Sequence, residues 1–230
     1  MLGITDTEIR RLIECVDYSE ALTLTAGESD VRAACNDAKR YGFRAVVAFP
    51  QYLKVLVEEL KGSPVLAQIP VGFPCGGGTT HVKCVEAEEG LRQGAKDLDM
   101  MMNLSAFKAG NYKRVAEDIG AVIEVAKPYG VPFKVIIEVG ALTDAEIVTA
   151  SKLVLESGAD FVKTCTGFGP GRVTVHAIRI IKETVGDRIG IKASGNVASM
   201  EDAVTLMRAG ATCVALRRDL VTQLDELVWR

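Results

Sequence analysis

Apolar runs recur along the chain, and most of them follow a glycine that closes an amphipathic stretch. Seven segments share this order: KRYGFRAVVAF, LKGSPVLAQIPVGF, LRQGAKDLDMMMN, KPYGVPFKVIIEV, LESGADFVKTCTGF, TVGDRIGIKAS and MRAGATCVAL. Glycine just past the last periodic residue commonly ends a helix, and a short apolar run is typical of a buried strand. Each segment therefore predicts a helix end followed by a strand.

The helix starts fit the same order. Three pairs match a hydroxyl N-cap with an acidic residue three positions later: Thr5 and Glu8, Thr143 and Glu146, and Ser199 and Asp202. A further strand in DYSEALTL brings the total to eight, each followed by a helix, with a short helix at about residues 5–15 ahead of the first. This alternation predicts a single-domain (β/α)8 TIM barrel over residues 1–230, with a doubly wound open sheet as the alternative.

The predicted strands also fit a barrel in their composition. AVVAF, FKVIIEV and IGIK are interpreted as apolar on both faces, as expected where helices cover one face and the barrel interior the other. Barrel enzymes carry their chemistry at the carboxyl ends of the strands. Polar residues at those ends are Asp17, the loop GFPCGGGTT, Asp97, Asp99, Asn103, Glu138, Lys163, Lys192, Arg217 and Arg218.

Two lysines on neighbouring strands suit Schiff-base chemistry. A lysine amine attacks a carbonyl only when neutral, and an ordinary pKa of about 10.4 leaves under about a thousandth of the groups neutral at pH 7. Burial and a nearby cation both lower a lysine pKa. Because neighbouring strands lie about 4.8 Å apart, we expect Lys163 and Lys192 to lower the pKa of one another. A lone lysine at a strand end more often reaches solvent or a carboxylate, so the hypothesis depends on the pair.

Asp99 is the candidate proton carrier beside these lysines. In DLDMMMN, alternation places Asp97, Asp99, Met101 and Asn103 on one face of a strand. The Asp99 carboxylate either neutralises a lysine or relays protons to and from a substrate hydroxyl, and the two roles are compatible. We assign no chemistry to the methionines, which fit core packing.

Composition narrows the classes of partner. A net charge of −3 and a pI near 5.6, with no cluster of Lys and Arg, argue against nucleic acid and against an anionic membrane. No secretory signal pattern and no long uncharged apolar run are present, so we expect a cytosolic (cytoplasmic) location. The six cysteines form no CxxC pair and are interpreted as reduced packing thiols.

Nothing in the sequence indicates a metal or an organic cofactor. His81 and His176, the two histidines, are not spaced as metal ligands and are interpreted as helix-start residues. The GGG at 76–78 lacks the Gly-Lys-Ser/Thr of a P-loop. We interpret it as a tight or mobile loop beside the active mouth.

Five segments together resemble the deoxyribose-phosphate aldolase family: VGFPCGGGTTHVKCVEAE, GAKDLDMMMN, KVIIEVGALTDAEI, GADFVKTCTGF and IKASGNV. They follow the family's order over most of the chain. The resemblance implies a cofactor-free, metal-independent class I aldolase that cleaves 2-deoxy-D-ribose 5-phosphate reversibly to acetaldehyde and D-glyceraldehyde 3-phosphate. It also implies that Lys163 forms the Schiff base, Lys192 perturbs its pKa and Asp99 relays protons.

The resemblance implies a phosphate pocket built from backbone amides and small residues after strands six, seven and eight. Gly167 and Gly195 match this pocket, and we add Thr166 and Asp17 as candidate substrate-binding residues. The family has a second glycine after Gly195, where this chain has Asn196. That departure leaves open whether the acceptor aldehyde is phosphorylated.

A second departure lies after the last strand, where ALRRDL replaces a small stretch and adds Arg217 and Arg218 as candidate substrate-binding residues. Three interpretations stay open: phosphate binding by a guanidinium, a changed acceptor, or arginines that face a helix-end carboxylate outside a degraded pocket. Tyr18, Ser19 and Phe49 also replace the family's commoner His, Thr and Asn, which suggests a reshaped substrate end.

The leading hypothesis is thus a class I aldolase acting on 2-deoxy-D-ribose 5-phosphate. One alternative is a related lysine aldolase or transaldolase-like enzyme with a different acceptor aldehyde. Another is a non-catalytic sugar-phosphate binding barrel, which the ALRR loop favours and the lysine pair disfavours. We expect a homo-oligomer, either a dimer or a tetramer, whose partner is a small sugar phosphate or related aldehyde.

Overall fold

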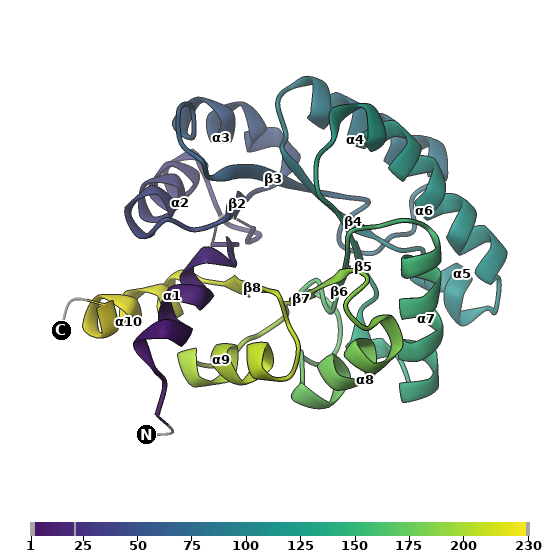
Figure 1. The fold of residues 1–230 in the computed structure, drawn as a ribbon. Coiled ribbons are helices and arrows are strands. Elements are labelled where there is room, and N and C mark those ends of the chain that lie inside the picture. The colour runs from purple at the N-terminus through teal and green to yellow at the C-terminus, as the bar shows by residue number, and fades with distance from the viewer. Residues whose placement is uncertain (1–2, 21, 229–230) are drawn as a thin grey trace.

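The computed structural model describes residues 3–20 and 22–228 and contains a closed barrel of eight parallel strands (Figure 1). Each strand pairs with the next along the chain, and the eighth pairs with the first. The predicted (β/α)8 barrel is confirmed, and the open-sheet alternative is wrong. The strands are β1 (Val16–Tyr18), β2 (Ala45–Val47), β3 (Leu66–Val71), β4 (Asp97–Met101), β5 (Phe133–Ile136), β6 (Phe161–Lys163), β7 (Gly190–Ala193) and β8 (Cys213–Leu216).

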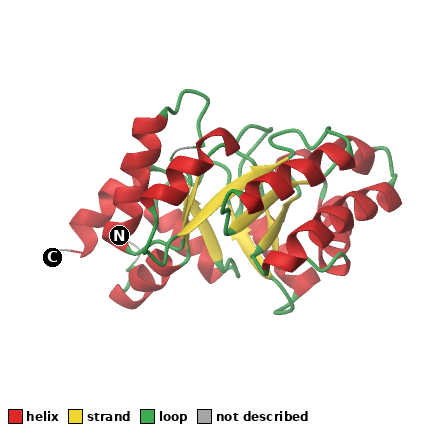
Figure 2. Ribbon diagram, turned by 90° about the horizontal axis from the view of Figure 1, so that it is seen from above, coloured by secondary structure: helices red, strands yellow, loops and turns green. Residues whose placement is uncertain are grey.

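Helices lie outside the ring of strands, as Figures 1 and 2 show from perpendicular directions. They are α1 (Asp6–Glu14), α2 (Glu28–Tyr41), α3 (Leu53–Glu59), α4 (Thr80–Arg92), α5 (Leu104–Lys108), α6 (Tyr112–Ala126), α7 (Asp144–Glu156), α8 (Val175–Val185), α9 (Met200–Arg208) and α10 (Arg218–Val228). Short 3-10 turns are η1 (Pro50–Tyr52), η2 (Lys127–Tyr129) and η3 (Val139–Ala141). The short helix predicted ahead of the first strand is α1, and two helices instead of one follow β4.

Helix caps agree with the sequence pattern in two of three cases. Thr5 begins α1 and Thr143 begins α7, each in a complete capping box. Ser199 caps α9 by accepting from the Asp202 N–H, but the Asp202 carboxylate accepts from Ala198 N–H and not from the cap residue. The pattern therefore located all three helix starts but overstated the third motif.

β1 is shorter than DYSEALTL predicted. After Tyr18, the Ser19 N–H donates to Leu216 O at 2.9 Å, and the Leu22 N–H then turns back to Ser19 O at 3.0 Å. The alternating leucines suggested a continuing strand, yet Leu24 is 83% exposed. The segment after β1 is a loop at the carboxyl end of the barrel.

The core lies between strands and helices, whereas the barrel interior holds charged side chains. Phe133 and Val135 of β5 pack in the hydrophobic core, and Lys134 between them contacts Asp97 of β4 inside the barrel. This is the alternation of a strand whose successive side chains point to opposite faces. The interpretation of FKVIIEV as apolar on both faces is therefore wrong at Lys134.

Candidate active site

Two lysine amines and one carboxylate meet inside the barrel. Lys163 and Lys192 are register partners on β6 and β7, so their side chains leave the sheet next to each other. Lys163 Nζ donates to Asp99 Oδ2 at 2.6 Å, and Lys192 Nζ donates to the same oxygen at 2.7 Å. The three catalytic candidates are thus in direct contact, because both lysine amines donate to the same Asp99 oxygen.

Their surroundings shift the two lysines in opposite directions. Lys163 is 3% exposed; burial lowers its pKa most, and the charge of Lys192 lowers it further against the opposing pull of Asp99. Burial also disfavours charge on Lys192, but Asp17 and Asp99 outweigh it and raise the Lys192 pKa. Lys192 therefore holds its proton while the Lys163 amine is shifted towards the neutral form. Burial contributes more to this shift than repulsion between the lysines.

Beneath the amines, further charged groups fill the interior. Asp17 is fully buried, with Oδ2 2.5 Å from Lys192 Nζ, and it also pairs with Arg44. Asp97 pairs with Lys134 and, at 2.6 Å, with Arg44. The sequence-predicted Asp17 and Asp99 therefore both contact Lys192, and neither is among the residues that line the cavity described next.

Sequence reasoning missed Gln68, which joins these groups. Gln68 Nε2 donates to Asp97 Oδ1 at 2.7 Å and to Asp99 Oδ1 at 2.8 Å, and its carbonyl accepts from Lys192 at 3.1 Å. Gln68 and Lys134 each interrupt an otherwise apolar strand, the signal that identified Lys163. Arg44 precedes its strand and gives no comparable signal.

The interior holds more potential positive than negative charge. The cations are Arg44, Lys134, Lys163 and Lys192, and the carboxylates are Asp17, Asp97 and Asp99. With every group charged, four cations face three carboxylates, which leaves an excess of one. Burial also raises the pKa of Asp97, which adds to the excess when that group is protonated. Loss of a proton from Lys163 relieves this imbalance.

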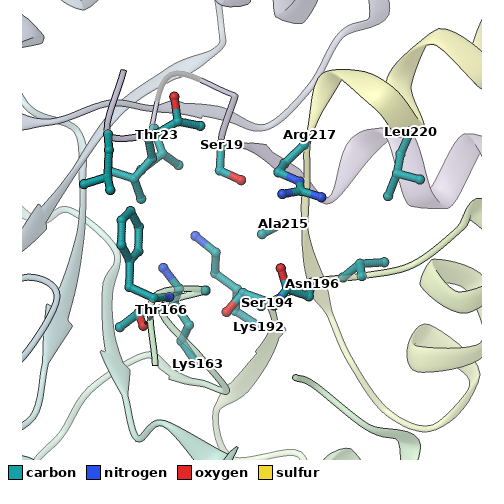
Figure 3. Close-up of a pocket in the computed structure, with 17 residues that line it drawn as sticks. Ser19, Thr23, Lys163, Thr166, Lys192, Ser194, Asn196, Ala215, Arg217 and Leu220 are labelled. Atoms are coloured by element: carbon teal, nitrogen blue, oxygen red, sulfur yellow. Dashed lines mark hydrogen bonds between the residues drawn. The ribbon is translucent and has the colours of Figure 1, made fainter. Parts of the chain in front are cut away.

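A cavity of about 260 Å³ opens above the two amines. Figure 3 shows the side chains of Lys163 and Lys192 extending into it, with Ser19 and Thr23 on one side and Arg217 on another. Of the two, only Lys163 keeps any exposed side-chain surface, 4%, whereas the Lys192 side chain is fully buried, so Lys163 is the amine that a small molecule in the cavity can reach. Cavity and lysines lie at the carboxyl ends of the strands, where chemistry is found in this fold.

One wall comes from the loops after β6 and β7, where Thr166, Gly167, Gly195 and Asn196 all line the cavity. A Cβ on Gly195 would lie 2.4 Å from Cys165 Cβ, so the close approach of these loops requires glycine there. Asn196 has φ +56°, a left-handed conformation that asparagine adopts more readily than most residues. The change from glycine to Asn196 is thus compatible with a left-handed backbone at this position.

The two arginines lie in different places. Arg217 lines the cavity, and its guanidinium is 3.7 Å from the Asp219 carboxylate. Arg218 is not among the lining residues. Its guanidinium lies 3.8 Å from the Asp37 carboxylate on α2, and its backbone N–H donates to the Glu20 carboxylate at 2.9 Å. Consecutive residues at a helix start point in different directions, which separates them. The outward interpretation therefore describes Arg218 but not Arg217.

Tyr18, Ser19 and Phe49, where the sequence departs from the family, lie in different places relative to the cavity. Ser19 lines the cavity, whereas Tyr18 is fully buried outside its lining. Phe49 packs on Phe73 with ring centroids 6.3 Å apart, and Phe73 packs on Phe168 at 5.3 Å. Phe168 lines the cavity, so these rings form an apolar support behind one wall.

Other sequence expectations concern metal, membrane and the glycine-rich loop. Across residues 3–20 and 22–228, no His, Cys, Asp and Glu cluster of three or more is arranged to hold a metal. None of the helices in these residues combines the length and the apolar character that a membrane span needs.

The glycine-rich loop at 76–78 is tight at Gly76. The Gly76 N–H donates to Gly72 O at 2.8 Å, and a Cβ on Gly76 would lie 1.9 Å from Met102 O.

Comparison with known proteins identifies the family of this chain. Residues 11–222 match the family described as DeoC/LacD family aldolase. Deoxyribose-phosphate aldolase 2 of Oceanobacillus iheyensis is 40% identical over 89% of this chain and 91% of its own length. Deoxyribose-phosphate aldolase of Thermoanaerobacter pseudethanolicus is 42% identical over 87% and 90%. The tetrameric deoxyribose phosphate aldolase structure from Aeropyrum pernix, 28% identical, superposes with a TM-score of 0.85 over 97% of this chain and 100% of that one. The chain belongs to the DeoC/LacD family of aldolases.

Proposed function

We propose that this chain is a class I aldolase that reversibly cleaves 2-deoxy-D-ribose 5-phosphate to acetaldehyde and D-glyceraldehyde 3-phosphate. The observation that carries the proposal is Lys163, a buried amine with a lowered pKa that opens on the cavity and shares Asp99 with Lys192. The names of the relatives support the choice of substrate.

Schiff-base formation begins at Lys163. Its neutral amine attacks the aldehyde carbon of the open-chain sugar, and the resulting carbinolamine loses water to give an iminium ion. Asp99 and Lys192 carry the protons that these steps release and consume, since Asp99 accepts from both lysine amines and Lys192 lines the cavity. The buried, charged surroundings keep this exchange away from bulk water.

Cleavage uses the iminium as the electron acceptor. A proton leaves the C3 hydroxyl, the C2–C3 bond breaks, and the electron pair moves into the iminium to form an enamine. Glyceraldehyde 3-phosphate departs as the aldehyde product. Protonation of the enamine at C2 and hydrolysis then release acetaldehyde and return the Lys163 amine. We assign the proton transfers to Asp99 and Lys192.

We place the phosphate at the wall formed by the loops after β6 and β7. In the described part of the chain, no residue accepts a hydrogen bond from the N–H of Gly167, Gly195 or Asn196. Backbone N–H groups of this kind make favourable anion sites. Arg217 supplies a charge that a backbone site lacks, and its guanidinium suits a phosphate oxygen.

A second candidate keeps the Schiff base and changes the acceptor aldehyde. It is favoured by Arg217, which faces the cavity and binds a carboxylate as readily as a phosphate. A panel of acceptors with phosphate, carboxylate or neutral tails distinguishes the two candidates. Binding without carbon–carbon cleavage would instead identify a non-catalytic barrel.

Reductive trapping tests the central proposal. Incubation with 2-deoxy-D-ribose 5-phosphate and borohydride is expected to leave a reduced adduct on the peptide that carries Lys163, located by mass spectrometry. Lys163→Met removes the adduct and turnover. Lys152→Met, which changes an exposed lysine on α7, retains both. An unmodified Lys163 peptide in a folded, substrate-exposed protein would contradict the assignment.

The remaining parts of the proposal are location and assembly. All six cysteines are free thiols, which suits a reducing compartment, and we assign the reaction to the cytosol. We also propose a homo-oligomer, as in the relative from Aeropyrum pernix. Val82 and Val85 on α4 are 56% and 50% exposed and offer apolar surface for it. A monomer in sedimentation velocity would contradict this part alone.

A further inference from the structure

Glu138, which follows β5, has an unfavourable backbone conformation. Its φ and ψ are 57° and 64°, and Asn196 is the other non-glycine residue with positive φ in the described chain. A left-handed conformation is costly for a residue with a side chain of this kind and persists where the surroundings impose it. Glu138 is also 3% exposed, so a carboxyl group is buried there.

The backbone on either side of Glu138 is bound to the strand that carries the Schiff-base lysine. Ile137 N–H donates to Lys163 O at 3.0 Å, and Val139 N–H donates to Thr164 O at 2.9 Å. These two bonds hold the residue at the end of β6. The left-handed turn between them sets the direction in which the Glu138 side chain leaves.

The carboxylate is bonded to the loop after β6. Glu138 Oε2 accepts from Thr166 N–H at 3.1 Å and from the Thr166 hydroxyl at 2.5 Å. Because a carboxylate only accepts, the hydroxyl must point its hydrogen at Glu138 and present its lone pairs elsewhere. Those lone pairs accept from Phe168 N–H at 3.0 Å and Gly169 N–H at 3.2 Å. Glu138 therefore orders two successive amides through Thr166.

The fit around Glu138 leaves little room for other arrangements. A Cβ on Gly169 would lie 2.6 Å from Glu138 Cδ, and a Cβ on Gly140 would lie 1.8 Å from Pro170 O. The loops after β5 and β6 are thus packed against each other at two glycines. Thr166, Gly167 and Phe168 of this assembly line the cavity, whereas Glu138 is not among the lining residues and reaches them through Thr166.

We propose that Glu138 is a positioning residue for the end of the substrate remote from its aldehyde. It fixes Thr166, and Thr166 fixes Phe168 and Gly169, so that the unpaired N–H of Gly167 stays in place for the phosphate. The inference rests on the proposed function for the identity of that phosphate. It assigns Glu138 no contact with reacting atoms.

The experiment compares two substrates in Glu138→Ala and Glu138→Gln. The measured quantity is kcat/KM for 2-deoxyribose 5-phosphate divided by kcat/KM for 2-deoxyribose. In Glu138→Ala this ratio falls at least about 10-fold, through KM for the phosphorylated sugar, because the tail site is displaced. Borohydride still traps acetaldehyde on Lys163, since acetaldehyde has no tail.

Glu138→Gln is expected to rescue the ratio to within about 3-fold of wild type. Its amide oxygen keeps both donors of Thr166, and the other Glu138 oxygen has no hydrogen-bond partner in the described structure to lose. Glu146→Gln is the matched control. Glu146 accepts from the N–H and the hydroxyl of Thr143 in the same way, but at the exposed start of α7. The kcat/KM ratio of the Glu146→Gln variant is therefore expected to stay at the wild-type value.

Hydrogen exchange keeps the inference separate from the proposed function. In Glu138→Ala the amides of Phe168 and Gly169 exchange faster than in wild type, whatever the substrate proves to be. Should Glu138→Ala not fold, Thr166→Val provides the same comparison with the hydroxyl removed. An unchanged ratio, or protection of 168–169 equal to wild type, overturns the inference. The inference is also overturned if kcat/KM falls equally for both sugars and the acetaldehyde adduct is lost. Glu138 would then stabilise the barrel in general and would not position the substrate tail.

Discussion

Among single residues, the reactivity proposed for Lys163 depends on the cation beside it. Lys192→Met removes a charge that lowers the Lys163 pKa, so that pKa rises. The neutral amine is then reached at higher pH, and the acidic limb of the kcat/KM profile moves to higher pH. Activity at neutral pH falls by more than about 10-fold because a proton carrier is also lost. The measurement is a pH–rate profile.

Lys192→Arg is the companion variant that separates charge from proton transfer. Arginine keeps the cation next to Lys163 but holds its proton throughout the working pH range. Activity therefore falls while the acidic limb stays near its wild-type position. An unshifted limb in Lys192→Met would show that burial alone sets the Lys163 pKa.

Arg217 and Arg218 offer a matched comparison for the substrate tail. Arg217→Ala removes the guanidinium that lines the cavity, and KM for the phosphorylated substrate is expected to rise about 10-fold with little change in kcat. Arg218→Ala leaves KM unchanged, since that side chain faces Asp37. Steady-state kinetics with both sugars measure the effect. A lower KM in Arg217→Ala would mean that the arginine obstructs phosphate and would favour a different acceptor.

How far single residues could be predicted depends on whether their signal is local. Lys163 stands out because it ends an apolar strand, and Asp99 because it lies in the middle of β4 between apolar residues. Lys134 carries the same signal nearer the start of its strand, where chemistry is not expected, and was overlooked. The separation of Arg217 from Arg218 is set by the direction of α10, which the sequence does not specify. Glu138 is recognisable from the sequence as a polar residue at a strand end, but the role proposed for it follows only from its backbone and its contact with Thr166.

Among the elements, α4 and α6 are joined by a fully buried ion pair. Lys83 Nζ lies 2.6 Å from Asp118 Oδ2 and also donates to Met101 O at 3.2 Å. Asp118→Ala leaves the ammonium buried without its counter-charge, which is expected to cost about 3 to 5 kcal/mol in the free energy of unfolding. Urea unfolding monitored by circular dichroism measures the loss.

The control for this prediction lies on the same helix. Lys113 and Glu117 form an exposed i,i+4 pair at 3.7 Å, with side chains 87% and 64% exposed. Glu117→Ala is expected to change the free energy of unfolding by less than about 0.5 kcal/mol, because solvent screens the pair. Equal losses in the two variants would contradict the importance of burial for the Lys83 pair.

Element prediction succeeded where helices ended in glycine and strands were apolar. It failed at β1, where Leu22 and Leu24 imitate strand alternation but the chain turns at Ser19 to bond with β8. That turn depends on Leu216, almost two hundred positions away along the chain. The extra helix α5 after β4 likewise follows from the cap at Asn103, which sequence reasoning had placed on the strand face.

For the molecule as a whole, charged side chains from β1, β4, β5, β6 and β7 are tied together inside the barrel. Burial acts to raise the pKa of Asp17 and of Asp99, yet nearby lysines, joined at Asp17 by Arg44, hold both below the ordinary value of 3.8. Carboxylates with depressed pKa stabilise the fold above the unfolded value, and this stabilisation is lost as pH falls through the folded value. The raised pKa of Asp97 acts in the opposite sense.

We therefore expect the free energy of unfolding to fall as the pH drops below about 4. The lowered pKa of Lys163 also costs stability, but this loss develops as pH falls from the ordinary lysine value to the lowered folded value and does not grow below it. Asp99→Asn is expected to be less stable than wild type at neutral pH and to show a shallower decline in acid. Urea unfolding over a pH series tests both. A wild-type stability that stays level in acid would show that the interior charges compensate one another at every protonation state.

The single oxygen that holds both amines has a consequence for the order of events. In the proposed mechanism the Lys163 amine attacks through its lone pair, so one of its N–H groups can keep donating to Asp99 Oδ2 throughout. Addition to the aldehyde leaves a cationic nitrogen that already touches the carboxylate able to take its proton. Lys192, bonded to the same oxygen, is placed to supply a proton when water departs. The resting contacts thus suit proton removal from the nitrogen first and loss of water second.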